Sequence, residues 1–242
     1  MSEEYEPDNL LDRRSSPRTL QLHYDWLFER ERRLVGRRLD LDAGGDVLSV
    51  GCGWHPGRHL FPAPAWRLTA NDLDAARAEW VVQDGRADAA APGAAGELHD
   101  LPDASFDVVL YRLVLHHIVF QGPLDPVFAE AARLLRPGGT AIAVEPGLWH
   151  PVGAGLALAN RVGLGTRIHG TPDDVPLSPR GLARHARRAG LQPELHALTY
   201  SWRRLPPRLQ RALHGADRAV GSIPPAARCG HTLLLLAHKP RA

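Results

Sequence analysis

Hydrophobic residues recur along the chain with two spacings, one typical of helices and one typical of buried strands. After Pro17, apolar residues recur near every third or fourth position with charged residues between them, which predicts an N-terminal helix. Its apolar positions are Leu20, Tyr24, Leu27, Leu34 and Leu39. Residues 1–15 have no such periodicity and are predicted to be a flexible arm, so we expect a single domain over residues 16–242.

Short, mostly aliphatic runs predict the strands of a sheet, separated by proline-rich and glycine-rich turns. The expected order is strand 46–50, helix around 57–63, strand 67–71, helix 74–82, strand near 95–99, strand 106–111, helix 124–135, strand 140–144, helix 178–190, strand 195–202, one helix within 206–225 and a last strand 232–237. Residues 87–96 are rich in alanine, glycine and proline, so an irregular loop competes with the strand near 95–99.

The first strand breaks into a glycine-rich turn. Gly51 and Gly53 let the backbone turn sharply and approach a ligand that a Cβ would exclude. Asp72 follows about twenty residues later, at the end of the next apolar run, where a carboxylate accepts hydrogen bonds from a ribose. This arrangement predicts a nucleoside-binding α/β unit. The next glycine is Gly57, so the spacing differs from the G-x-G-x-x-G pattern that holds a pyrophosphate.

Two later segments extend this pattern. Residues 103–118 predict a turn, a strand and the apolar start of a helix, and residues 134–146 predict a helix end, a tight turn and a strand. With the glycine turn, they resemble the class I S-adenosylmethionine-dependent methyltransferases, especially the branch of quinone C-methyltransferases and many small-molecule methyltransferases. The resemblance covers residues 44–146 strongly and the terminal strand more loosely.

The resemblance implies an α/β, Rossmann-like fold. Its seven-stranded sheet is mostly parallel, has helices on both faces, and carries an antiparallel last strand between its two predecessors. The N-terminal helix lies beside the cofactor pocket, and two insertions, at about 146–176 and 203–225, are expected to cap the substrate. The expected core of the domain is about 44–146.

The resemblance also implies S-adenosylmethionine as cofactor and S-adenosylhomocysteine as its product. Gly51 and Gly53 match the family's first motif, an acid-x-Gly-x-Gly-x-Gly run beside the methionine end of the cofactor. Ser49 stands where the family usually has the acid. His55 or a shifted Gly57 replaces the third glycine, and His55 either touches the amino-acid tail of the cofactor or points to solvent.

Two acidic positions are expected at the nucleoside end. Asp72 matches the ribose-binding acid, and Glu97 takes the adenine-contacting position, with Asp100 as the competing alignment. The full set implied for the cofactor is Ser49, Gly51, Cys52, Gly53, Asp72, Leu73, Glu97, Leu98 and Tyr111. Cys52 is interpreted as a small turn residue rather than a nucleophile, because nothing near it in sequence supplies a base.

Ligands of open α/β sheets bind outside the carboxyl ends of the strands, so catalytic residues are sought there. His116 and His117 follow the strand that ends at Tyr111, and a neutral imidazole is a suitable general base. Adjacent helical residues point about 100° apart, so we expect at most one of them to face the site. A structural role for both histidines is the alternative. Glu145 either orients the substrate or caps the next helix at its N-terminus.

Substrate contacts are sought in the segments that follow the strands. Trp149 and His150 follow the fifth strand and suit a planar substrate, although the tryptophan alternatively fills a gap under the insertion. His169, inside the first insertion, is a further candidate. Tyr24 and Trp26 on the N-terminal helix either contact the ligand or pack against the edge of the sheet.

Composition excludes several other classes of protein. The 242 residues carry a net charge of +2 and are 44% hydrophobic, which is ordinary for a soluble domain. The arginines alternate with acids and Lys239 is the only lysine, so we expect no nucleic-acid surface. Cys52 and Cys229 are too far apart to suggest a disulfide framework or a metal site. The polar N-terminus and the absence of a long apolar run predict a cytoplasmic protein without membrane insertion.

The sequence therefore predicts a methyltransferase that acts on oxygen, carbon or nitrogen of a small or medium organic acceptor. A degenerate S-adenosylmethionine-binding protein without turnover is the first alternative, because Ser49 replaces the usual acid. An RNA methyltransferase and a nucleotide-dependent oxidoreductase are weaker alternatives. No motif specifies the acceptor or an oligomeric state.

Overall fold

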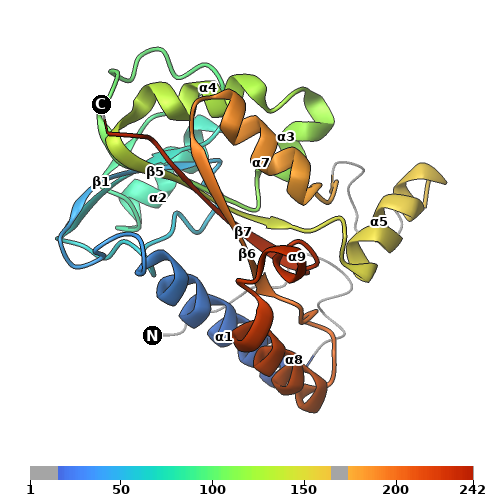
Figure 1. The fold of residues 1–242 in the computed structure, drawn as a ribbon. Helices are drawn as coiled ribbons and strands as arrows, with labels where there is room; N and C mark the ends of the chain where they lie inside the picture. The colour runs from blue at the N-terminus through green and yellow to red at the C-terminus, as the bar shows by residue number, and fades with distance from the viewer. Residues whose placement is uncertain (1–15, 165–173, 242) are drawn as a thin grey trace.

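The computed structural model describes residues 16–164 and 174–241. Its centre is one seven-stranded sheet in the order β3-β2-β1-β4-β5-β7-β6 (Figure 1). The strands are β1 (Gly45–Val50), β2 (Trp66–Asn71), β3 (Ala89–Ala90), β4 (Phe106–Arg112), β5 (Leu135–Pro146), β6 (Gln192–Thr199) and β7 (Thr232–His238). The pairings among β1 to β5 are parallel, and β7 pairs antiparallel with both β5 and β6. The expected Rossmann-like sheet with an inserted antiparallel last strand is confirmed.

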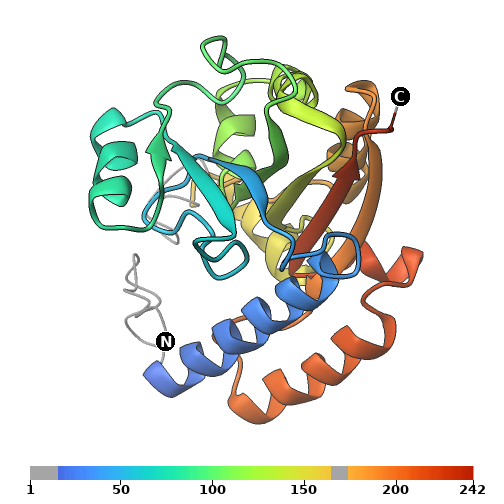
Figure 2. The same ribbon diagram turned by 90° about the vertical axis from the view of Figure 1, so that its left-hand side faces the viewer.

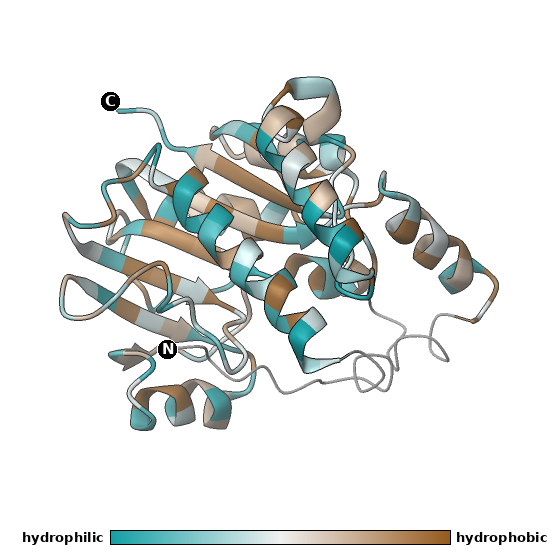
Figure 3. Cartoon of the chain, turned by 90° about the horizontal axis from the view of Figure 1, so that it is seen from below, coloured by the Kyte–Doolittle hydropathy of each residue, from teal (hydrophilic) through white to brown (hydrophobic). Residues whose placement is uncertain are grey.

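Helices cover both faces of this sheet. They are α1 (Pro17–Val35), α2 (Ala75–Gln83), α3 (Leu115–Gln121), α4 (Asp125–Leu134), α5 (Pro151–Arg161), α7 (Pro179–Arg188), α8 (Pro207–Val220) and α9 (Pro224–Ala227). The strands alternate between two cores: Leu110 packs on the α1 side, whereas Tyr111 packs on the α4 side. In the hydropathy view, the strands are mostly hydrophobic, whereas hydrophobic and hydrophilic residues alternate along the long helices in front (Figure 3).

The N-terminal helix and the second insertion lie side by side beneath the sheet (Figure 2). Trp26 of α1 donates a hydrogen bond from Nε1 to Asp217 of α8 at 2.8 Å, and its ring stacks on His214 at 4.6 Å. Trp26 therefore joins two helices rather than packing against the sheet edge. The single helix expected within 206–225 is in fact α8 and α9, because α8 ends at Gly221 and Pro224 begins a new turn.

Two expected elements are absent. Residues 57–63 form only one turn, in which Leu60 and Phe61 both donate to the Gly57 carbonyl, because Pro62 and Pro64 lack the N–H groups that would continue a helix. Residues 95–99 are a loop, and the third strand is instead the two-residue β3. The loop's backbone is held by Glu130 and Arg133 rather than by a neighbouring strand.

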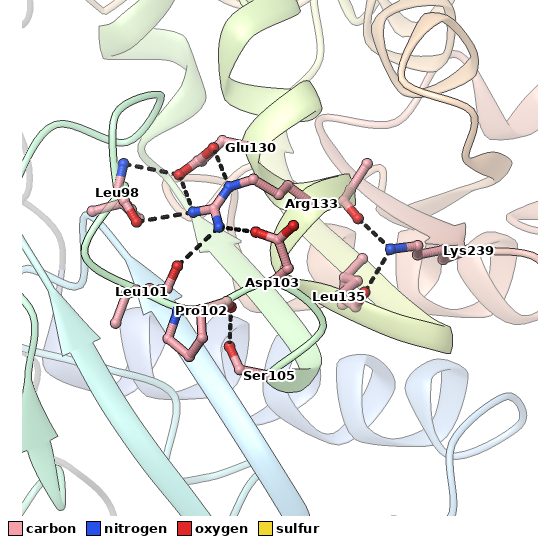
Figure 4. A network of polar contacts seen from close by, with 10 residues as sticks. Leu98, Leu101, Pro102, Asp103, Ser105, Glu130, Arg133, Leu135 and Lys239 are labelled. Atoms are coloured by element: carbon pink, nitrogen blue, oxygen red, sulfur yellow. Dashed lines mark hydrogen bonds and ion pairs between the residues drawn. The ribbon is translucent and has the colours of Figure 1, made fainter.

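Arg133 of α4 is the centre of that loop contact (Figure 4). Its guanidinium donates to the carbonyl of Leu98 at 3.0 Å and to that of Leu101 at 2.9 Å, and it pairs with Glu130 and Asp103. Glu130 in turn accepts the N–H of Leu98 at 2.9 Å. These side-chain bonds replace the hydrogen bonds that a strand would have supplied, so the loop is fixed although it is irregular.

Among the described residues, none of the helices is both long and apolar enough to cross a bilayer.

Candidate functional site

A cavity of about 2100 Å³ opens at the carboxyl ends of the parallel strands. The turns after β1, β2, β4 and β5 all contribute to its wall, as the rule for open α/β sheets predicts. The start of α5, the α1 face that looks toward the sheet, and residues 202–204 complete it. The cavity therefore collects residues from both ends of the chain around the glycine turn.

The glycine turn has the backbone conformation that its residues predict. Gly51 and Gly53 have φ values of +59° and +54°, in the region that disfavours side chains. A Cβ on Gly51 would lie 2.2 Å from Val114 Cγ2, so this glycine is needed for close packing against the segment after β4. No heavy atom lies within 4 Å of the Cβ position of Gly53, so a side chain there would extend into open space at the cavity wall. The turn is thus shaped as a cradle for a ligand.

Asp72 and Leu73 follow β2 and stand next to this turn. Asp72 accepts the N–H of Gly53 on Oδ2 at 3.1 Å and that of Asp74 on Oδ1 at 3.0 Å, and Arg77 Nη1 lies 3.5 Å from Oδ1. Leu73 is 73% exposed, an unusual position for a large apolar side chain. A carboxylate beside an exposed apolar surface and a glycine cradle suits a ribose and a base, so this part of the wall fits a nucleoside.

Asn71 is a residue of this wall that the sequence reasoning missed. Its side-chain amide donates to the carbonyls of Ala91 and Gly93 at 2.8 and 3.0 Å, and its oxygen accepts from the N–H of Gly51 at 3.4 Å. It therefore ties the glycine turn to the segment beside Leu73. The only signal in the sequence was a polar residue at the end of a buried strand.

Four residues expected at the cofactor do not line the cavity. Ser49 is buried within β1, and Tyr111 points to the opposite face of the sheet, where its hydroxyl donates to Val127 O at 3.2 Å. Glu97 is exposed and Leu98 is buried on the Arg133 loop, and neither reaches the cavity. The competing Asp100 is also exposed outside it.

Residues 93–96 line the wall where Glu97 and Leu98 were expected. The residues that line this wall lie a few positions earlier in the chain than expected. The reason is that β3 ends at Ala90, so the chain reaches the cavity before residues 95–99.

His116 and His117 both line the cavity at the start of α3. Glu145, completely buried at the end of β5, accepts the N–H groups of Val114, Leu115 and His116 at 3.0, 2.8 and 3.4 Å. Glu145 therefore caps α3, a helix earlier in the chain, and not the next helix α5, which His150 caps.

Glu145 also contacts the His116 ring, at 2.7 Å from Nδ1. Because a carboxylate can only accept, Nδ1 carries the proton and Nε2 is the basic nitrogen of the neutral ring. Nε2 lies 3.8 Å from Asp174, and the His117 ring packs against that of His116 at 4.0 Å. His116 is thus flanked by carboxylates on both sides.

Two of the expected substrate residues, Trp149 and His150, do not line the cavity. Arg180 lies 5.0 Å from the centre of the Trp149 ring. His150 caps α5, accepting the N–H of Val152 at 3.2 Å, and burial lowers its pKa. Its ring lies 5.1 Å from that of His231, which does line the cavity. His169 is outside the described residues.

Cys52 and His55 both line the cavity. Burial raises the pKa of the Cys52 thiol to about 12, with a further contribution from Asp72, so this cysteine is a poor nucleophile. Among the described residues, no group of histidines, cysteines and acids is arranged to hold a metal ion.

A buried ion pair on the α1 side of the cavity was also missed. Glu31 of α1 is completely buried and lies 3.1 Å from both Nε and Nη2 of Arg112, and 3.2 Å from His59 Nε2. Burial alone would raise the pKa of Glu31, but Arg112 and His59 more than offset it and bring the pKa to about 2. Tyr24 and Phe28, also on α1, line the cavity beside this pair.

Fold and cavity together are similar to those of one class of enzymes. A nucleoside-type cradle at the end of β1, an acid after β2 and an antiparallel β7 between β5 and β6 are the features of the class I S-adenosylmethionine-dependent methyltransferases. Residues 48–143 match the family model described as "Methyltransferase domain". The cofactor of the class is S-adenosylmethionine.

Two curated relatives support this identification. The chain is 34% identical over 153 residues to a "Probable S-adenosylmethionine-dependent methyltransferase" of Mycolicibacterium smegmatis, covering 58% of this chain and 55% of that protein. It is 33% identical over 155 residues to "Methyltransferase GfsG" of Streptomyces halstedii, covering 61% of this chain and 47% of the relative. The matched region thus spans about half the length of these relatives.

A solved structure extends the likeness to the whole fold. The crystal structure of a SAM-dependent methyltransferase from Archaeoglobus fulgidus matches 89% of this chain and 100% of its own, with a TM-score of 0.56 and 16% sequence identity. At that identity, the match concerns the fold alone.

Proposed function

We propose that the protein transfers a methyl group from S-adenosylmethionine to oxygen, carbon or nitrogen of a small or medium organic acceptor. The observation that carries this proposal is that the glycine cradle, Asp72 and His116, whose ring contacts the buried Glu145, line one cavity. Residues 16–242 would act as one catalytic domain, with the segments about 146–176 and 203–225 covering the acceptor.

The nucleoside end of the cavity would hold the cofactor. Gly51, Cys52 and Gly53 would take its amino-acid end, Asp72 its ribose, and Leu73 with residues 93–96 its adenine. The cofactor supplies a methyl group already activated on a sulfonium. The protein's own contribution is therefore mainly alignment, which is worth roughly 7–11 kcal/mol when two reactants are held in order.

His116 would take the proton that a hydroxyl, amine or acidic carbon loses when it is methylated. Glu145 holds the ring through Nδ1, so Nε2 is the nitrogen that receives the proton. Asp174, 3.8 Å from Nε2, would stabilise the imidazolium that results. His116 is the preferred base of the two, because the contact with buried Glu145 fixes its ring and leaves Nε2 as the basic nitrogen.

The test compares two histidines that have the same partner type. In His116→Gln, methyl transfer to any acceptor found in a panel of phenols, amines and carboxylic acids should fall by roughly 10²–10⁴-fold, with affinity for S-adenosylhomocysteine kept. His185→Gln is the matched control, because its Nδ1 lies 2.6 Å from Asp125 but its ring is outside the cavity.

Turnover equal to wild type in His116→Gln would remove this histidine from the mechanism. Tight cofactor binding by the wild-type protein without turnover of any acceptor would instead favour the role of a binding protein.

A further inference from the structure

Arg112 occupies a particular place at the rim of the cavity. It is the last residue of β4, one position beyond Tyr111, which pairs with Val50 just before the glycine turn. Because side chains alternate along a strand, Arg112 shares the face of Leu110, which packs on the α1 side, rather than that of Tyr111. Arg112 lines the cavity and its side chain is mostly buried. The guanidinium of Arg112 therefore lies near the glycine cradle, on the α1 side of the sheet.

The orientation of this cation is fixed. Glu31 receives Nε and Nη2 of Arg112, each at 3.1 Å, in the two-pronged geometry that matches a guanidinium to a carboxylate. The Phe28 ring lies 5.3 Å from the centre of the guanidinium. A side chain held on one edge and one face loses little further freedom when a ligand binds its other edge.

That other edge still has donors to offer. A guanidinium has five N–H groups, and the two bonds to Glu31 use one on Nε and one on Nη2. The remaining three lie on Nη1 and Nη2, and among the described residues none accepts from them. Nη1 has no acceptor among the described residues, yet it is not one of the buried polar atoms that lack a partner. It is therefore accessible from outside the protein interior. The Nη1–Nη2 edge is the fork that binds a second carboxylate with two parallel hydrogen bonds.

The surroundings favour a monoanion attached to an apolar or planar group. Arg112 and Glu31 neutralise each other, so the pair offers directed hydrogen bonds rather than the excess positive charge that suits a phosphate dianion. Phe28, at 4.6 Å from the His59 ring and 6.1 Å from Tyr24, forms with them an aromatic wall beside the fork. All three rings line the cavity.

We propose that the Nη1–Nη2 edge of Arg112, held in place by Glu31, is a carboxylate-binding subsite of the cavity. The proposal rests on the proposed function, because both sources of the carboxylate belong to that reaction. One source is the amino-acid tail of the cofactor, and the other is a carboxylate on the methyl acceptor. Arg112 would then determine which ligands bind and how they lie.

The test replaces the fork while keeping the charge. Arg112→Lys retains a cation for the buried Glu31 but loses the two-pronged geometry, and the double variant Glu31→Gln/Arg112→Gln removes both charges together, in case the lysine variant folds poorly. Arg180→Lys is the matched control, because Arg180 packs on Trp149 and lies outside the cavity. Thermal unfolding checks that each variant is folded.

Calorimetry then measures affinity for two sets of probes. The first set is S-adenosylhomocysteine, its decarboxylated analogue and 5′-methylthioadenosine, which lacks the amino-acid tail. The second set is benzoate and hexanoate, each against its amide, added to protein saturated with S-adenosylhomocysteine. Loss of a charge-assisted pair of hydrogen bonds is expected to weaken binding of the carboxylate probe by roughly tenfold or more, and to leave its uncharged analogue unaffected.

Each result has a definite meaning. A loss confined to S-adenosylhomocysteine assigns the subsite to the cofactor tail, and a loss confined to benzoate or hexanoate assigns it to the acceptor. If Arg112→Lys binds every probe as the wild type does, or if no carboxylate probe is preferred over its uncharged analogue, the subsite does not exist. Failure of the wild type to bind even 5′-methylthioadenosine would overturn the proposed function itself, which separates the two failures.

Discussion

Two carboxylates organise the cavity at the scale of single residues. Asp72 holds the N–H groups of Gly53 and Asp74, and Glu145 holds those of Val114, Leu115 and His116. Each acid fixes the turn that follows a strand; Asp72 itself lines the cavity, and Glu145 holds the ring of His116, which lines it. The shape of the cavity and its chemistry therefore depend on the same side chains.

Replacing Asp72 should affect cofactor binding strongly. In Asp72→Ala, affinity for S-adenosylhomocysteine should fall by roughly tenfold or more, since a hydrogen bond to a charged group is worth about 1.5–3 kcal/mol. Asp84→Ala is the control. Asp84 caps the C-terminus of α2, the helix that follows Asp72 in the chain, and it pairs with Arg86 outside the cavity. Calorimetric titration gives both affinities, and an undiminished value for Asp72→Ala would mean that the ribose site is elsewhere.

The sequence identified some of these residues and missed others for a physical reason. Gly51, Gly53 and Asp72 could be placed because their role depends on local spacing after two recognisable strands. Glu31 and Arg112 could not, since they are 81 positions apart and only the packing of α1 brings them together. Single-sequence patterns contain no information about such pairings.

At the scale of elements, the loop after β3 is the clearest departure from the sequence prediction. The chain from residue 94 to 101 lacks strand hydrogen bonds, and Arg133 supplies replacements from α4 (Figure 4). Residues 93–96, around the start of this segment, form the wall proposed for the adenine. An alanine-rich and glycine-rich segment gives no periodic signal, so its conformation depends on a distant helix.

Weakening that contact should therefore reach the cofactor. In Arg133→Gln, the carbonyls of Leu98 and Leu101 lose their donors, so we expect a lower melting temperature and a several-fold weaker affinity for S-adenosylhomocysteine. Arg136→Gln is the comparison. Arg136 pairs with Asp46 and Asp107, which lie at the amino ends of β1 and β4, away from the cavity. Arg136→Gln should lower stability without changing the affinity for S-adenosylhomocysteine. Equal affinities in the two variants would mean that the loop held by Arg133 does not contribute to cofactor binding.

At the scale of the whole molecule, the sheet gathers residues from both ends of the chain around one cavity. Most strands of the sheet could be predicted from their buried apolar runs, whereas the antiparallel β7 between β5 and β6 followed only from the resemblance to a known family. The resemblance placed α1 beside the pocket, and Tyr24 of α1 does line the cavity. The other cavity-lining residues of α1 and residues 202–204 could not be predicted, since neither segment has a motif and each is positioned only by packing. The core of the fold was thus more predictable than the walls that would select an acceptor.

The most direct test of the account is a calorimetric titration of the purified protein with S-adenosylhomocysteine, S-adenosylmethionine and NAD. The glycine cradle beside Asp72 predicts micromolar binding of the first two and none of NAD, because the glycine spacing does not fit a pyrophosphate. Absence of binding to both sulfur-containing ligands, or binding of NAD in their place, would contradict the assignment of this cavity to a methyl donor.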